Sequence, residues 1–152
     1  MWFWKPVKEF IPSEDTKIFL FSDTHFGHDR QFIWGPRHFE SVAAHDEALI
    51  ANWNSVVGPN DIVYLLGDVM LGDNNHGLEC LRRLNGHIII IRGNHDTDTR
   101  VALYEKEPNV LRVVPAEYLR VGKYHFYLSH FPTLTGNLEA ESLKQCTLNF
   151  YG

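Results

Sequence analysis

Side chains of the kinds that bind divalent metal ions follow four short apolar runs of this sequence. The runs cover residues 18–21, 62–66, 88–91 and 126–128, and the polar residues after them include Asp23, His25, Asp68, Asn94, His95 and His130. Carboxylate, amide and imidazole groups together suit a divalent transition metal. Each ending alone is weak evidence, but four such endings predict one convergent site.

The first two endings supply carboxylates. Asp23 and His25 are two positions apart, so in extended backbone their side chains point to the same side and one ion can contact both. Asp68 ends a wholly apolar run. By itself an aspartate there is commonly a helix cap or turn former, yet its two oxygens also allow it to bridge two ions.

The last two endings supply an amide and imidazoles. Asn94 offers a carbonyl oxygen, although an Asn-rich turn explains it equally well when it is taken alone. His95 can exchange a proton near neutral pH, and Asp96 is expected to hold its ring in one tautomer. His130 follows the fourth apolar run. Taken alone, a histidine at the end of a strand is usually packed in the core or exposed to solvent and binds no metal.

Weaker candidates lie beside these residues. His28 follows Gly27 in the first loop and is a candidate contact to a phosphate oxygen. Arg92 precedes Gly93 and is either a substrate contact or part of a structural ion pair. Packing or solvation accounts for the remaining histidines, which are His38, His45, His76, His87 and His125.

The apolar runs are typical of buried strands, and helical periodicity appears between them. The first half alternates β-α-β-α-β, which predicts a parallel sheet, and in such sheets ligands bind at the carboxyl ends of the strands. The second half favours hairpins, so the whole is expected to be mixed α/β. The expected strands are 17–22, 61–66, 87–91, 110–114, 117–121, 124–129 and 147–151, and the expected helices are 29–34, 42–57, 77–84, 98–105 and 137–145.

Composition limits the class of protein. The 152 residues suit one domain, and the net charge of −5 provides no electrostatic footprint for non-specific nucleic-acid binding. No apolar run reaches the roughly 18 residues of a membrane span, and Lys5 and Pro6 interrupt the aromatic start before a signal-peptide core forms. Cys80 and Cys146 are expected to be free thiols. These features favour a cytoplasmic protein.

Taken in order, Asp-x-His, Gly-Asp, Gly-Asn-His-Asp and Ser-His resemble the motifs of the calcineurin-like metallophosphoesterase superfamily, and most closely its small bacterial and phage branch. The resemblance covers about residues 17–152. It implies a two-layer sandwich of mixed β-sheets flanked by helices, and two divalent ions, with Mn²⁺ favoured over Fe, Zn, Ni or Co. It also implies hydrolysis of a small phosphate ester, preferably a diester, by a metal-bridging hydroxide.

The resemblance also assigns residues. It implies that Asp23 and His25 hold one ion, that Asn94 and His130 hold the other, and that Asp68 bridges them. His95 then lies near the phosphoryl group with Asp96 in support. The family's final Gly-His-x-His motif would begin at Gly152, where this sequence ends. Each ion would then be one histidine short, and we expect a fragment rather than a natural truncation with damaged metal affinity. The alternative is a non-catalytic binding or scaffold module with an incomplete metal site. The oligomeric state stays open.

Overall fold

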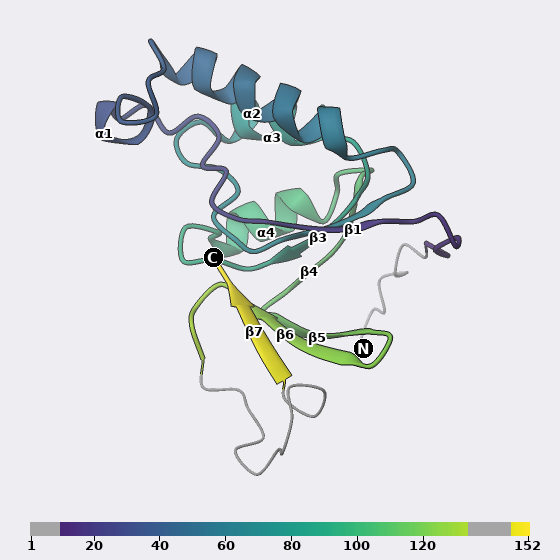
Figure 1. The fold of residues 1–152 in the computed structure, drawn as a ribbon. Helices are drawn as coiled ribbons and strands as arrows, with labels where there is room; N and C mark the ends of the chain where they lie inside the picture. The colour runs from purple at the N-terminus through teal and green to yellow at the C-terminus, as the bar shows by residue number, and fades with distance from the viewer. Residues whose placement is uncertain (1–9, 134–146) are drawn as a thin grey trace, which may run out of the picture.

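The computed structural model describes residues 10–133 and 147–152, and these form two β-sheets and four helices (Figure 1). The first sheet contains β1 (Ile18–Phe21), β2 (Ile62–Leu65), β3 (His87–Ile91) and β4 (Val110–Val114). Its strands are all parallel and lie in chain order. The predicted parallel sheet is therefore confirmed, and the carboxyl ends of its strands lie along one edge.

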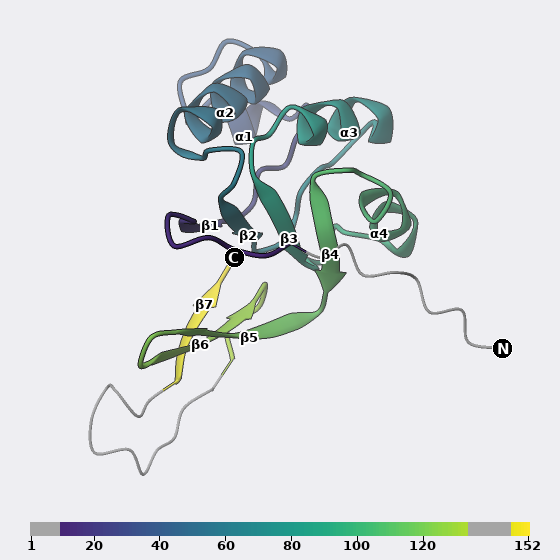
Figure 2. The same ribbon diagram turned by 90° about the vertical axis from the view of Figure 1, so that its right-hand side faces the viewer.

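The second sheet has three strands in the described residues. β5 (Ala116–Val121) and β6 (Tyr124–Ser129) form an antiparallel hairpin, and β7 (Thr147–Tyr151) pairs parallel with β6. The hairpin was predicted, but the parallel pairing of β6 with β7 was not. Figure 2 shows this sheet beneath the four-stranded sheet, on the side away from the helices.

The helices cover the other face of the parallel sheet (Figures 1 and 2). They are α1 (Gln31–Trp34), α2 (Val42–Val56), α3 (Asn74–Arg82) and α4 (Asp98–Tyr104). α3 begins three residues before its predicted start at 77. The carboxylate of Asp73 explains this, because it accepts hydrogen bonds from the backbone amides of Asn75 and His76 and so caps the helix.

The run Ile88–Ile91 in β3 connects the layers, because successive side chains of a strand point to opposite faces. Ile88 and Ile90 pack in the larger core with Trp53 and other helix residues, whereas Ile89 and Ile91 pack with Leu128 of the second sheet. All four isoleucines are almost completely buried. A strand that is apolar on both faces is thus explained by its position between two layers.

The α/β class and the two-sheet sandwich are confirmed. Cys80 is a buried free thiol, as expected. The predicted helix 137–145 and Cys146 lie outside the described residues. Within residues 10–133 and 147–152, no helix is both long and apolar enough to cross a membrane.

Candidate metal centre

The loops that follow β1 and β2 run side by side at the carboxyl edge of the parallel sheet. The amide of Asp23 donates to the carbonyl of Gly67 (3.2 Å), and that of His25 donates to the carbonyl of Asp68 (3.0 Å). Asp23, His25 and Asp68 have φ angles of 54°, 47° and 54°. Such left-handed backbone is uncommon outside glycine and concentrates at functional sites, so three cases in two adjacent loops mark this edge as a candidate site.

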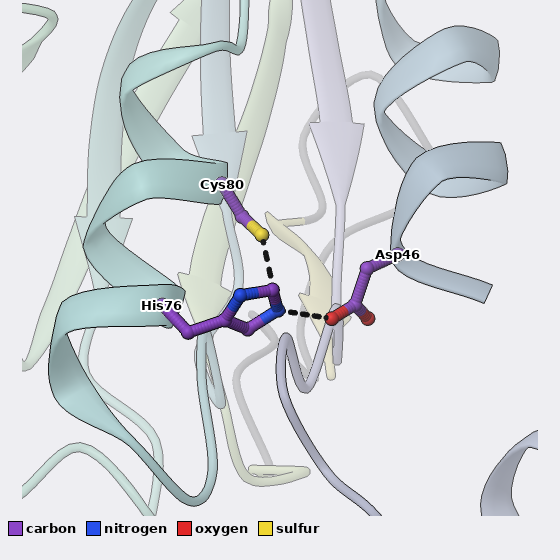
Figure 3. Close-up of side chains that lie close together, drawn as sticks. All are labelled: Asp46, His76 and Cys80. Atoms are coloured by element: carbon purple, nitrogen blue, oxygen red, sulfur yellow. Dashed lines mark hydrogen bonds and ion pairs between the residues drawn. The ribbon is translucent and has the colours of Figure 1, made fainter. Parts of the chain in front are cut away.

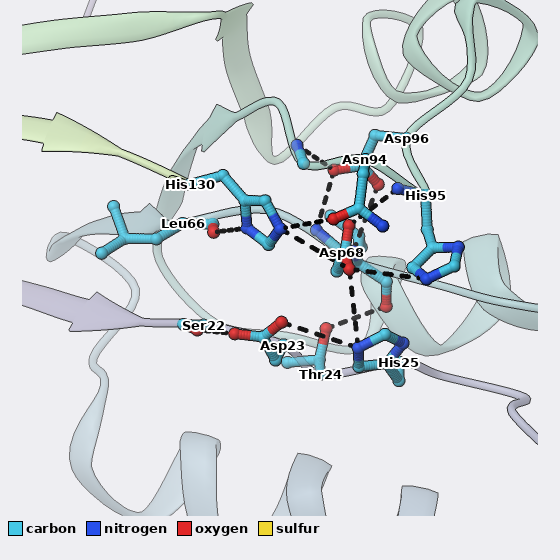
Figure 4. Close-up of polar contacts among 12 residues, drawn as sticks. Ser22, Asp23, Thr24, His25, Leu66, Asp68, Asn94, His95, Asp96 and His130 are labelled. Carbon is cyan, nitrogen blue, oxygen red and sulfur yellow. Dashed lines mark hydrogen bonds and ion pairs between the residues drawn. The ribbon is translucent and has the colours of Figure 1, made fainter. Parts of the chain in front are cut away.

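The carboxylate of Asp68 lies at the centre of the site (Figure 4). It is only 3% exposed. Its Oδ2 is 3.7 Å from Nε2 of His25, 3.7 Å from Nε2 of His130 and 3.9 Å from Nε2 of His95. These separations are too long for hydrogen bonds. They are within reach of donors that share an ion, since two bonds of about 2.0–2.2 Å span up to about 4.4 Å.

His130 presents a free lone pair to this centre. Its Nδ1 lies 2.8 Å from the carbonyl oxygen of Leu66, which can only accept, so Nδ1 carries a proton. In the neutral ring Nε2 is then an acceptor, and it faces Oδ1 of Asn94 at 3.0 Å as well as Asp68. A cation at this point would therefore meet three acceptors, which are Nε2 of His130, Oδ1 of Asn94 and the carboxylate of Asp68.

His25 is also prepared to act as a ligand. Its Nε2 lies 3.6 Å from Oδ1 of Asp23, and its buried Nδ1 has no hydrogen-bond partner. Burial lowers the pKa of His25 below its ordinary value, although the carboxylates of Asp68 and Asp23 oppose this effect. The ring is therefore neutral at pH 7, which is the form that binds metals.

Two glycines allow the loops to approach closely. A Cβ atom at Gly67, whose φ is +91°, would lie 2.6 Å from Nδ1 of His130 and 2.8 Å from the backbone nitrogen of Gly93. A Cβ atom at Gly93 would lie 2.6 Å from the backbone nitrogen of Asp68. Glycine at both positions lets the second and third strand ends meet at Asp68.

The carboxylate of Asp96 contacts backbone amides rather than the ring of His95, which we expected it to hold. The carboxylate is completely buried and accepts hydrogen bonds from the backbone amides of Asp68 (2.9 Å), Val69 (3.2 Å) and Gly93 (2.8 Å). The hydroxyl of Tyr104 donates to it as well (2.9 Å). Its described hydrogen bonds do not include the ring of His95. Asp96 thus holds the loops after β2 and β3 together.

Replacing Tyr104 by phenylalanine should lower the free energy of unfolding by about 1.5–3 kcal/mol, the usual effect of losing a buried hydrogen bond to a charged group. Tyr104 is fully buried, so solvent cannot replace the lost donor. Urea unfolding followed by circular dichroism measures the change. Tyr118→Phe is the control, because Tyr118 is 67% exposed and should lose little. Equal stability of the two variants would contradict this role of Asp96.

The two weaker candidates lie near the site. The ring of His28 is 5.4 Å from the ring of His25, and its Nδ1 is buried without a partner. Arg92 forms an ion pair with Asp98 (2.8 Å) and donates to the carbonyl of Asp96 (2.8 Å). The ion-pair alternative for Arg92 is therefore present in the structure, while a substrate contact by either residue stays a prediction.

The donor set fits divalent metal ions. Ligand atoms of Asp23, Asp68 and His130 all lie within 4.8 Å of one another, and His25 and Asn94 lie beside them. Carboxylate, imidazole and amide donors gathered at one point suit transition metals. The structure thus brings together every residue that the sequence predicted as a ligand.

Comparison with known proteins agrees with this arrangement. The family model described as calcineurin-like phosphoesterase matches residues 16–145. The chain therefore belongs to the calcineurin-like phosphoesterase family. Members of this family typically bind divalent metals, and the site above holds candidate ligands for them.

Its relatives include archaeal and phage proteins. An uncharacterized protein of Methanocaldococcus jannaschii is 49% identical over 82 residues, which are 53% of this chain and 47% of that protein. The gene 66 protein of Mycobacterium phage D29 is 29% identical over 158 residues, covering 90% of this chain and 74% of its own. The chain thus spans about half the length of the archaeal relative.

A solved structure shares the fold. A protein of unknown function from Aquifex aeolicus superposes with a TM-score of 0.61 at 24% identity, over 86% of this chain and 69% of its own. At this identity the likeness supports the fold alone.

Proposed function

We propose that this chain is a metal-dependent phosphoesterase that hydrolyses a small phosphate ester, with a phosphodiester favoured. The proposal depends most on the position of Asp68, whose buried carboxylate faces the Nε2 atoms of His25, His95 and His130 at 3.7–3.9 Å. A buried carboxylate among three imidazoles is costly without a cation or protons to balance it. This cluster lies at the sheet edge where ligands of α/β proteins bind.

In this proposal two divalent ions, with Mn²⁺ favoured, share the site. Asp23 and His25 would hold one ion, and Asn94 and His130 would hold the other. Asp68, whose Oδ2 faces both His25 and His130, would bridge the two ions. When bound, such a pair lowers the pKa of water toward neutrality and neutralises charge on the phosphoryl oxygens.

The chain's own residues orient these groups. Leu66 fixes the tautomer of His130 through its carbonyl oxygen, so Nε2 is the ring atom that faces the site. The backbone amide of His95 donates a hydrogen bond to Oδ1 of Asp68 (2.9 Å). This bond holds the backbone of His95, and therefore its Cβ atom, beside that carboxylate. The carboxylate of Asp96 accepts hydrogen bonds from the backbone amides of Asp68 and Gly93, and so joins the loops that follow β2 and β3.

His95 is the proposed general acid. Its side chain is 43% exposed, so the ring can reach both solvent and a bound ester. Its Nε2 lies on the side of the ring nearest Asp68 and is the atom that would carry the proton to the leaving oxygen. Because water is the nucleophile in this scheme, no phosphorylated enzyme is expected.

Hydrolysis of bis-p-nitrophenyl phosphate tests the proposal. The full-length protein, freed of metal and then supplied with Mn²⁺, should release p-nitrophenol, and exhaustive chelation should abolish the release. Re-addition of Mn²⁺ should restore the activity, which distinguishes metal loss from unfolding. Activity that persists after chelation would contradict metal dependence. Metal binding without turnover of mono- or diesters would instead favour a non-catalytic binding module.

A further inference from the structure

A second cluster of metal-binding side chains lies between helices α2 and α3, apart from the site at the sheet edge. It consists of Asp46 from α2 and of His76 and Cys80 from α3 (Figure 3). Nε2 of His76 is 2.8 Å from Oδ2 of Asp46 and 3.6 Å from Sγ of Cys80. The three ligand atoms all lie within 4.8 Å of one another.

The helices direct these side chains toward one point. His76 and Cys80 are four residues apart in α3, so they lie on the same face of the helix. Asp46 and Cys80 are buried, whereas the side chain of His76 is 43% exposed. An ion at this point would therefore have two buried ligands and one ligand at the surface, with access for water.

Neighbouring residues fix the carboxylate of Asp46. Arg37 donates to Nε2 of His45 (2.7 Å), so the proton of the neutral His45 ring is on Nδ1. Nδ1 in turn donates to Oδ1 of Asp46 (3.1 Å). This chain of contacts occupies Oδ1 and leaves Oδ2 directed toward His76.

The distances suit zinc. Bonds of about 2.3 Å to sulfur and about 2.0 Å to nitrogen, at a tetrahedral angle, place the two atoms about 3.5 Å apart. The observed separation of Sγ from Nε2 is 3.6 Å. The contact of Asp46 with His76 is a hydrogen bond that would lengthen by about half an ångström on metal binding.

We propose that Asp46, His76 and Cys80 bind a Zn²⁺ ion, with water in the fourth position. Thiolate, imidazole and carboxylate are the ligands that zinc prefers. Without metal, burial raises the pKa of Cys80 to about 12. As zinc binds, the thiol must release its proton to solvent, and the proton that Nε2 of His76 shares with Asp46 must leave that nitrogen, so that the neutral ring carries its proton on Nδ1. The affinity should therefore fall as the pH is lowered.

The ion would also stabilise the loop that follows β1, which carries Asp23 and His25 of the proposed phosphoesterase site. Oδ2 of Asp46 accepts a hydrogen bond from the backbone amide of Gly27 (2.9 Å). Gly27 lies between His25 and His28 in that loop. Zinc binding should therefore raise the melting temperature of the chain.

Cobalt spectroscopy tests this site. Co²⁺ added to the chain in a reductant without thiols should produce the near-ultraviolet band of charge transfer from sulfur to cobalt, and Zn²⁺ should then remove it. The ligands proposed at the sheet edge contain no sulfur, so they cannot produce this band. Cys80→Ser should abolish the band, and the matched control Cys146→Ser should keep it.

A second variant covers the case in which Cys80→Ser does not fold. His76→Asn changes a half-exposed side chain and should weaken cobalt binding at this band by at least about 10-fold, since even supporting partners of a metal ligand contribute that much. The proposal is overturned if saturating Co²⁺ gives no sulfur band, or if the band survives Cys80→Ser. Unchanged affinity in His76→Asn would also overturn it, and the cluster would then be a hydrogen-bonded contact between helices.

Discussion

Replacing Asp68 by asparagine is expected to remove metal binding and activity together. Asparagine keeps the shape of the side chain and can still accept the hydrogen bond from the backbone amide of His95, but it removes the negative charge that faces three imidazoles. Losing a supporting partner of a ligand typically lowers metal affinity 10–100-fold, and losing a bridging ligand should lower it by at least that factor. Isothermal titration with Mn²⁺ measures the loss.

Asp98→Asn is the matched control for this substitution. Asp98 is 94% exposed and pairs with Arg92 outside the ligand cluster. Its replacement should leave Mn²⁺ affinity unchanged. If Asp68→Asn binds Mn²⁺ as tightly as the original chain does, Asp68 is not a ligand and the proposed arrangement is wrong.

Replacing His95 by alanine should separate catalysis from metal binding. The structure gives His95 a backbone hydrogen bond to Asp68 that alanine retains, so the carboxylate should keep its position. Loss of the ring removes the proposed proton donor, and kcat for bis-p-nitrophenyl phosphate should fall by about 10²–10⁴-fold. Metal content, measured by elemental analysis, should stay the same.

The control for His95 is His125→Ala. His125 is exposed on β6, away from the strand ends that form the site, and its replacement should not affect kcat. A His95→Ala sample with full metal content and undiminished turnover would remove His95 from the mechanism. A sample that has lost its metal would instead make His95 part of the metal site.

The sequence was sufficient to predict the strands and the residues that meet at the sheet edge, because both depend on local patterns. Apolar runs such as Ile88–Ile91 indicate strands buried on both faces, and parallel strands bring their carboxyl ends to one edge. Residues placed just after the runs were therefore expected to meet. The close approach of Asp23 and His25 to Asp68 follows from this topology, because β1 and β2 are parallel neighbours. His130 follows β6 of the second sheet, so its approach to Asp68 depends on how the two sheets pack.

Contacts without a local pattern could not be predicted. The carboxylate of Asp96 bonds to the amides of Asp68 and Val69, which are 28 and 27 positions away. Nothing in the Asn-His-Asp motif distinguishes this role from support of His95. The early start of α3 was missed because its first three residues, Asn74, Asn75 and His76, are polar and show no apolar pattern, although Asp73 is a good helix-capping residue.

The cluster between α2 and α3 was missed for a related reason. We expected His76 to be packed or solvated, just before a helix over residues 77–84, so its spacing of four residues from Cys80 did not indicate a shared helix face. Asp46 comes from another helix, and its approach to His76 depends on how α2 and α3 pack on the sheet. The spacing alone does not predict that contact.

Anomalous diffraction from crystals grown with Mn²⁺ would locate the metal ions relative to Asp68. Two manganese peaks about 3.5–4 Å apart are expected. One peak should contact Asp23 and His25, the other should contact Asn94 and His130, and both should contact the carboxylate of Asp68. Manganese bound elsewhere, with no peak at bonding distance from Asp68, would show that these residues do not form the metal centre.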